Sequence, residues 1–249
     1  MPPLRSVLLC TTPRSGSTLL CTLLCEADVA GRPESWFRKE DRAEFATGWG
    51  LPPDPDFADY LAAAIRAGQS PNGTFGLRMM ANNLTGLVAD LADLHGTAPD
   101  PALLHLAFGD VRYVRLKRRD TVAQAVSLTR AEASGLWHRN SDGSPRELFG
   151  VAPKPVTYDA IVIAAYLAEI EALNSQWDRW FDTHGITPAF LTYETLSADP
   201  SAAVRKLLDG LGESTANPVR PGTAKLADAV SADWISRFRR ETGHPPDAL

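Results

Sequence analysis

Along the chain, short apolar runs alternate with longer stretches in which the apolar residues have helical spacing. Residues 6–12 form an apolar run that ends in a turn containing Pro13 and Gly16. Residues 17–27 then place apolar side chains at the spacing of one helix face. The opening of the chain therefore predicts a strand, a loop and a helix.

The same order recurs further along the chain. Apolar strand patterns cover residues 74–80, 112–118 and 188–194, and each precedes a stretch with helical spacing. Asn82 or Asn83 is suited to cap the helix after the second strand, and Asp120 to cap the helix after the third. A long helix is predicted over residues 158–183 and another over 199–212. Strands that alternate with helices indicate an α/β fold with a central, mostly parallel sheet flanked by helices on both faces, a three-layer arrangement.

Two stretches fit this alternation poorly, residues 31–55 and 136–155. They are rich in Gly, Pro, Trp and charge. Long irregular connections in a compact domain are more often functional loops than linkers. We therefore expect these two segments to border a functional site.

Composition limits the class of protein. A chain of 249 residues with 44% apolar composition is long enough to bury a core, and we interpret residues 1–249 as one domain. No apolar run reaches about 18 residues and no leader pattern is seen, so we expect a cytoplasmic protein without a membrane span. The formal net charge of −5 disfavours a nucleic-acid partner. The three cysteines are an odd number in apolar segments, which favours reduced, buried thiols.

The first chemical signal is the loop within residues 11–18. A strand that turns through Pro13, Arg14, Ser15, Gly16, Ser17 and Thr18 into a helix directs backbone N–H groups and the positive helix end at one place, which favours an anion. The plainer alternative is a helix capped by Ser after an ordinary turn. The loop lacks the Gly-Lys-Ser/Thr of a nucleotide-triphosphate site, and neither the second nor the third predicted strand ends in an Asp for a metal. A phosphate or phosphosulfate donor bound without a metal fits this loop better than ATP with Mg²⁺.

The second signal is the element 112–127. Five basic residues crowd into positions 112–119 and lead directly into a helix. For Arg112 and Arg115, a solvated strand end or ion pairs with surface acids is the favoured interpretation. Arg119 differs because Ser127 follows eight positions later, about two helical turns away. This pair predicts a second anion site.

Together the two segments resemble a known family. The sequence "TPRSGST" is similar to the 5′-phosphosulfate loop of sulfotransferases, and "RRDTVAQAVS" is similar to their 3′-phosphate element. The longer stretches "LLCTTPRSGSTLLCTLLCEADVAGRPESWF" and "RLKRRDTVAQAVSLTRAEASGLWH" resemble the trehalose 2-sulfotransferase family. The similarity extends to "SADWISRFRRETG" and so covers most of the chain.

The resemblance implies a P-loop-like fold and 3′-phosphoadenosine 5′-phosphosulfate (PAPS) as donor, with PAP as product and no metal. It implies that the 13–18 loop binds the 5′ end, that Arg119 and Ser127 bind the 3′-phosphate, and that Glu34 is the general base of an in-line transfer. We assign Arg14 to neutralise charge on the leaving oxygen. Related enzymes suggest that the C-terminal segment 218–240, with Lys225, closes over the cofactor. The implied acceptor is a small-molecule hydroxyl, with the 2-position of trehalose as the leading candidate, and the implied oligomer is a homodimer.

Several alternatives remain open at this point. Glu34 also fits a surface carboxylate paired with Arg32 or Arg38, and His138 is an alternative base. Another sugar, a glycolipid or a secondary-metabolite hydroxyl are alternative acceptors. For the whole chain, the alternatives are a small-molecule kinase with an unusual P-loop and a non-catalytic nucleotide-binding module.

Overall fold

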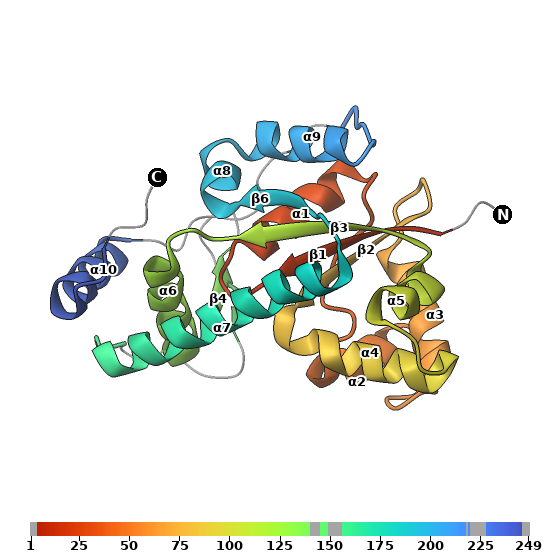
Figure 1. Ribbon diagram of the computed structural model, residues 1–249, viewed down its shortest axis with the longest axis horizontal. Coiled ribbons are helices and arrows are strands. Elements are labelled where there is room, and N and C mark those ends of the chain that lie inside the picture. The colour runs from red at the N-terminus through yellow and green to blue at the C-terminus, as the bar shows by residue number, and fades with distance from the viewer. Residues whose placement is uncertain (1–3, 140–144, 149–155, 218, 220–227, 246–249) are drawn as a thin grey trace.

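The central sheet contains four parallel strands and is seen edge-on in Figure 1. The computed structural model describes residues 4–139, 145–148, 156–217, 219 and 228–245. The strand order is β2-β1-β3-β6. The strands are β1 (Arg5–Thr11), β2 (Thr74–Met80), β3 (Asp110–Lys117) and β6 (Ala189–Thr192). The chain moves to one side of β1 to form β2 and to the other side to form β3, so their carboxyl ends flank a switch point of the kind where open α/β sheets bind ligands.

Helices cover both faces of the sheet, as the sequence predicts (Figure 1). The helical elements are α1 (Ser17–Ala27), η1 (Lys39–Asp41), α2 (Arg42–Gly48), α3 (Phe57–Gly68), α4 (Ala81–His95), α5 (Asp100–Phe108), α6 (Thr121–Ser134), α7 (Ala160–His184), α8 (Tyr193–Ala198), α9 (Pro200–Gly210) and α10 (Ala229–Thr242). Among them, none in the described part of the chain is long and apolar enough to cross a bilayer.

The pleat of β1 divides its side chains between two apolar clusters. Leu8 and Cys10 pack with α3, α4, α5 and α7, whereas Val7 and Leu9 pack with α1 and α9 on the opposite face. This two-sided burial explains why the strand is an unbroken apolar run. The predicted α/β fold with a mostly parallel sheet between helical layers is confirmed.

A third apolar cluster joins α6, α7 and α10 beside the carboxyl edge of the sheet. Val126 of α6 and Ile163 of α7 are buried there with Trp234 and Phe238 of α10. In Figure 1 α10 accordingly lies next to α6, away from the sheet. The C-terminal helix is thus attached to the helix that follows β3.

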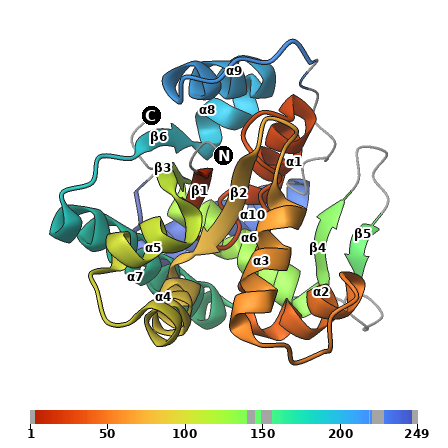
Figure 2. The same cartoon turned by 90° about the vertical axis from the view of Figure 1, so that its right-hand side faces the viewer.

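A separate hairpin pairs β4 (Leu136–Arg139) with β5 (Pro145–Leu148). Figure 2 shows it standing apart from the central sheet. The segment expected to be irregular over residues 136–155 therefore contains antiparallel structure.

Four local predictions were wrong. Residues 31–55 contain η1 and α2 instead of being irregular throughout, because Trp36, Phe45 and Trp49 pack together there with ring centroids 5.1–5.7 Å apart. Helix α4 begins directly after Met80, with neither asparagine as its cap. The interpretation of Arg115 as a solvated residue was wrong, because it is 1% exposed and donates to Asn174 at 2.7 Å. The alternative interpretation is borne out, because Arg115 forms an ion pair with the surface carboxylate of Asp178 at 3.5 Å. Of the thiols, Cys25 is exposed.

Candidate functional site

The turn between β1 and α1 lies at the carboxyl edge of the sheet with two residues in the left-handed region. Arg14 has φ 60° and Gly16 has φ 90°. Helix α1 begins at Ser17 without a side-chain cap, and the buried hydroxyl of Ser15 has no hydrogen-bond partner among the described residues. Left-handed turns direct backbone N–H groups toward one point, and a helix N-terminus adds positive potential. The turn is therefore suited to an anion.

Gly16 is required at this turn for space as well as for its backbone. A Cβ at this position would lie 2.5 Å from Cδ2 of Tyr193. The guanidinium of Arg118 stacks on the Tyr193 ring, with 4.7 Å between Cζ and the ring centroid. Tyr193 therefore connects the turn to the end of β3.

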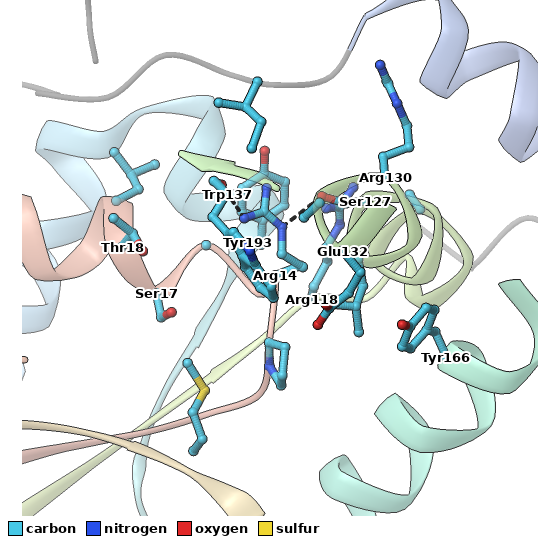
Figure 3. A pocket seen from close by; sticks show the side chains of 18 of the residues that line it. Arg14, Ser17, Thr18, Arg118, Ser127, Arg130, Glu132, Trp137, Tyr166 and Tyr193 are labelled. Atoms are coloured by element: carbon cyan, nitrogen blue, oxygen red, sulfur yellow. Dashed lines mark hydrogen bonds between the residues drawn. The ribbon is translucent and has the colours of Figure 1, made fainter. Parts of the chain in front are cut away.

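Arg14 extends from the turn to α6. Its Nε donates to Ser127 Oγ at 3.0 Å, and a terminal nitrogen donates to the carbonyl of Trp137 at 2.5 Å. Gln124 of α6 donates to Thr12 Oγ1 at 3.0 Å and to the carbonyl of Pro13. Figure 3 shows Arg14 between the turn and α6. The two anion elements predicted from the sequence are thus in direct contact.

The turn that follows β3 places the consecutive residues Arg118 and Arg119 in different surroundings. The backbone N–H groups of Arg119 and Asp120 donate to the Glu194 carboxylate at 3.1–3.3 Å. Asp120 then caps α6 by accepting from Ala123 N at 2.7 Å, as predicted. In this backbone arrangement Arg118 lines the cavity and Arg119 is exposed outside the cavity lining.

The surroundings of Arg118 suit an arginine that binds an anion. Burial lowers the pKa of its guanidinium, and Tyr193 and Asp120 oppose that shift. Its Nε is buried without a hydrogen-bond partner among the described residues. A buried cation with an unsatisfied donor gains from a bound phosphate. Sequence spacing pointed to Arg119, because strand alternation does not reveal which of two consecutive arginines a turn directs inward.

Glu34 lies on the loop beside β2, next to the cavity residue Ser35 but outside the cavity lining itself. Its carbonyl accepts from Arg78 N at 3.0 Å, and its carboxylate accepts from Ser35 N at 2.7 Å. The carboxylate also forms an ion pair with Arg78. The alternative partners suggested by the sequence, Arg32 and Arg38, pair with Asp28, Glu40 and Asp41 instead.

Arg78 is a site residue that the sequence analysis missed. It donates to Thr18 Oγ1 at 3.2 Å and to Ser35 Oγ at 2.9 Å, and it lines the cavity. The available signal was an arginine inside an otherwise apolar strand, two residues before the strand ends at the ligand-binding edge of the sheet.

These elements surround one cavity of about 970 Å³. Figure 3 shows part of its wall, with Ser17 and Thr18 on one side and Glu132 and Tyr166 on the other. The volume is at the upper end of the range of small-molecule sites, about 300–1,000 Å³, and suits a nucleotide together with a second small molecule. Residues that bring polar groups to the wall include Ser17, Thr18, Ser35, Arg78, Asn82, Asn83, Arg118, Ser127, Arg130, Glu132, Tyr166, Glu169, Tyr193 and Asp228.

The start of α10 also borders the cavity. Arg130 of α6 pairs with Asp228, with distances of 2.5 and 2.9 Å, and Arg239 of α10 pairs with Asp120 at 3.0 Å. These two ion pairs hold α10 against α6. Lys225 and the side chain of His138 lie outside the described residues.

The parallel sheet, the left-handed turn after its first strand and the cavity beyond it are the features of an α/β protein with a P-loop-like turn. The family model described as Stf0 sulphotransferase matches residues 6–241, and the chain belongs to that family. It is therefore a sulfotransferase, as predicted, and the kinase and the non-catalytic module are not supported.

Two relatives cover nearly the whole chain. Trehalose 2-sulfotransferase from Mycobacterium tuberculosis (strain ATCC 35801 / TMC 107 / Erdman) is 28% identical over 264 residues, which is 95% of each protein. Trehalose 2-sulfotransferase from Mycolicibacterium smegmatis (strain ATCC 700084 / mc(2)155) is 28% identical over 261 residues, 94% of each protein. Among solved structures, the chain is similar to a sulfotransferase from Alicyclobacillus acidocaldarius, with a TM-score of 0.47, 13% identity and 97% of each chain covered.

Proposed function

We propose that this sulfotransferase moves the sulfuryl group of PAPS to a hydroxyl of a carbohydrate, with the 2-position of trehalose as the leading acceptor. The observation that carries the proposal is the contact between Arg14 and Ser127, because it places both anion elements on one cavity. PAPS has a 5′-phosphosulfate and a separate 3′-phosphate, so its binding requires two such elements.

The residues present fit this donor. The buried, unpartnered Oγ of Ser15 and the N-terminus of α1 suit the 5′ end, together with Pro13, Arg14, Gly16, Ser17 and Thr18. For the 3′-phosphate we propose Ser127 with Arg118, whose buried Nε is unsatisfied among the described residues. The role predicted for Arg119, and that of Lys225 in a C-terminal segment closing over the donor, stay predictions.

When bound, PAPS supplies the sulfuryl group and PAP leaves without a metal. Glu34 would accept the proton of the acceptor hydroxyl while the hydroxyl oxygen bonds to sulfur and the bond between sulfur and the leaving oxygen of PAP breaks, in an in-line transfer. Arg14 stands between the two anion elements, where its charge stabilises the leaving oxygen.

The wall opposite the 13–18 loop supports a sugar as acceptor. Glu132, Tyr166 and Glu169 line it, and Trp137, beside Arg14, lines the same cavity. Burial raises the pKa of the Tyr166 phenol, and the two carboxylates raise it further, so the phenol remains a donor at neutral pH. Carboxylates and a phenol can bind several hydroxyls at once, and an indole can cover a sugar face. The name shared by the two relatives makes trehalose the first acceptor to test.

A homodimer belongs to the same proposal. Ile161 and Val162 at the start of α7 are 82% and 37% exposed and would lose apolar surface in an interface. The oligomeric state is measured by light scattering after size exclusion. The cytoplasmic location and the single-domain organisation stay predictions.

The test is transfer of ³⁵S from labelled PAPS by the purified protein to trehalose, glucose, and lipid or aglycone alcohols, with the product position assigned by NMR. We expect 2-sulfated trehalose and loss of transfer in Glu34→Gln. Transfer to another acceptor alone would reject trehalose and keep the enzyme class. Absence of PAP binding in calorimetry would reject the donor.

A further inference from the structure

Arg78 contacts three residues from two different segments of the chain through its side chain. Its Nε donates to the hydroxyl of Ser35 at 2.9 Å, a terminal nitrogen donates to the hydroxyl of Thr18 at 3.2 Å, and the other terminal nitrogen pairs with the carboxylate of Glu34. Only an arginine presents donors in a rigid fork that reaches three such partners at once. Hydrogen bonds to several partners therefore fix the position of this guanidinium.

The same residue also fixes the main chain of Glu34. Arg78 N donates to the Glu34 carbonyl at 3.0 Å, and Glu34 forms an isolated parallel bridge with Leu77. The loop at this point is in effect a short extra strand along β2. Both the backbone and the carboxylate of Glu34 are thus positioned by the end of one strand.

Exposure distinguishes the two members of the ion pair. The side chain of Arg78 is 16% exposed and that of Glu34 is 42% exposed. The cation is the embedded member and the carboxylate is the accessible one. Arg78 and Ser35 line the cavity, and Glu34 adjoins them without being part of the lining.

Thr18 connects this arrangement to the donor loop. It lies in the first turn of α1 and lines the cavity with Arg78 and Ser35. A hydroxyl that accepts from a guanidinium acts as a donor through its own O–H, which is the role an anion site requires. One side chain therefore contacts both the proposed base and the element proposed to bind the 5′ end of the donor.

We propose that Arg78 is a positioning residue that holds the Glu34 carboxylate at a fixed position relative to Thr18 at the start of α1. This inference rests on the proposed role of Glu34 as base. Proton abstraction requires the base within about 2.6–3.2 Å of the acceptor hydroxyl. A displacement of about 1 Å is enough to reduce turnover on the order of 100-fold.

The test compares Arg78→Met, Glu34→Gln and the double variant in steady-state sulfate transfer, with PAP affinity from calorimetry and the melting temperature measured for each. We expect Arg78→Met to lower kcat about 100-fold and to change the PAP Kd by less than about threefold. In the Glu34→Gln background the same substitution should lower kcat by less than about threefold, because Arg78 acts through Glu34. Arg78→Lys keeps the charge but not the fork, and we expect it to recover part of kcat.

Arg42→Met is the matched control. Arg42 pairs with Asp90 at 2.5 Å, with side chains 20% and 23% exposed, outside the cavity lining. We expect it to lower the melting temperature without changing kcat. If Arg78→Met does not fold, Arg78→Lys carries the test, with a loss of kcat that disappears in the Glu34→Gln background.

The outcomes separate this inference from the proposed function. Equal loss of kcat in both backgrounds would overturn it, and so would a rise in PAP Kd with kcat unchanged. A loss of turnover in Glu34→Gln with none in Arg78→Met would reject the positioning role and keep the base. If Glu34→Gln keeps wild-type turnover, Glu34 is not the base, and the positioning role of Arg78 is rejected as well.

Discussion

The side chain of Arg14 donates from Nε to the hydroxyl of Ser127 at 3.0 Å, although the two residues are 113 positions apart in the chain. The contact joins the left-handed turn after β1 to the second turn of α6. A second bond from Arg14 to the Trp137 carbonyl at 2.5 Å fixes the guanidinium against the start of β4. Two segments that the sequence predicts separately as anion sites are thus in direct contact and line one cavity.

The first prediction concerns Arg14→Lys. Lysine keeps the positive charge but cannot contact Ser127 and the Trp137 carbonyl with the same fork. We expect kcat/KM for sulfate transfer to fall on the order of 10- to 100-fold, with a smaller rise in the PAP Kd. Steady-state kinetics and calorimetry measure both quantities.

Arg5→Lys is the control for Arg14→Lys. Arg5 forms a surface ion pair with Glu213, so we expect its substitution to leave kcat/KM unchanged. Unchanged kcat/KM in Arg14→Lys would contradict this role.

The second prediction compares Arg118→Ala with Arg119→Ala. Arg118 is a cavity residue with a buried, unsatisfied Nε among the described residues, whereas Arg119 is exposed. Loss of a charge-assisted hydrogen bond costs about 1.5–3 kcal/mol, so we expect the PAP Kd to rise about 10- to 150-fold in Arg118→Ala. For Arg119→Ala we expect a rise of less than about threefold. Calorimetric titration with PAP measures both, and a larger effect in Arg119→Ala would favour the assignment from sequence spacing.

The elements at the opening of the chain could be predicted because local pattern determines them. Residues 17–27 and 74–80 match the observed α1 and β2, and Asp120 caps α6 as expected. Helix α2 was missed because its stability depends on aromatic packing of Phe45 and Trp49 with Trp36, which a linear pattern does not display. Helix α3 was missed although residues 57–68 carry apolar side chains at helical spacing.

The candidate site was predictable to the level of segments. Residues of both predicted segments, the turn after β1 and helix α6, line one cavity, and their roles as anion sites stay predictions. Which arginine enters the cavity depends on Glu194, which holds the backbone of Arg119 from 75 positions away. The role of Arg78 depends on a loop pairing with β2, and nothing local to β2 indicates that pairing.

The third prediction concerns alkaline stability. Burial raises the pKa of the Cys21 thiol to about 12, and burial also raises the pKa of Cys10. Unfolded thiols ionise from about pH 8.5, so above that pH the unfolded state releases protons that the folded state keeps. The free energy of unfolding should therefore fall with rising pH, by up to about 1.4 kcal/mol per pH unit for each buried thiol.

Urea unfolding between pH 7 and pH 10 measures this slope. We expect Cys21→Ala to have a shallower slope than the wild type, whatever its stability at pH 7. Cys25→Ala is the control, because Cys25 is exposed, and it should keep the wild-type slope. Equal slopes in Cys21→Ala and the wild type would contradict the prediction.

The fourth prediction separates backbone strain from steric overlap at the turn after β1. In Gly16→Ala the new Cβ would meet the Tyr193 ring at 2.5 Å while the backbone keeps φ 90°. Gly96 has φ 84°, and a Cβ there would have no described atom within 4 Å, so Gly96→Ala carries the strain alone. We expect Gly96→Ala to cost about 1 kcal/mol of stability and to leave PAP binding unchanged.

Gly16→Ala has to displace Tyr193 and with it the stacked Arg118, so we expect the PAP Kd to rise more than about tenfold beyond any loss of stability. Calorimetry and thermal unfolding of the two variants measure the difference, and equal PAP affinities would show that the contact with Tyr193 does not shape the anion site.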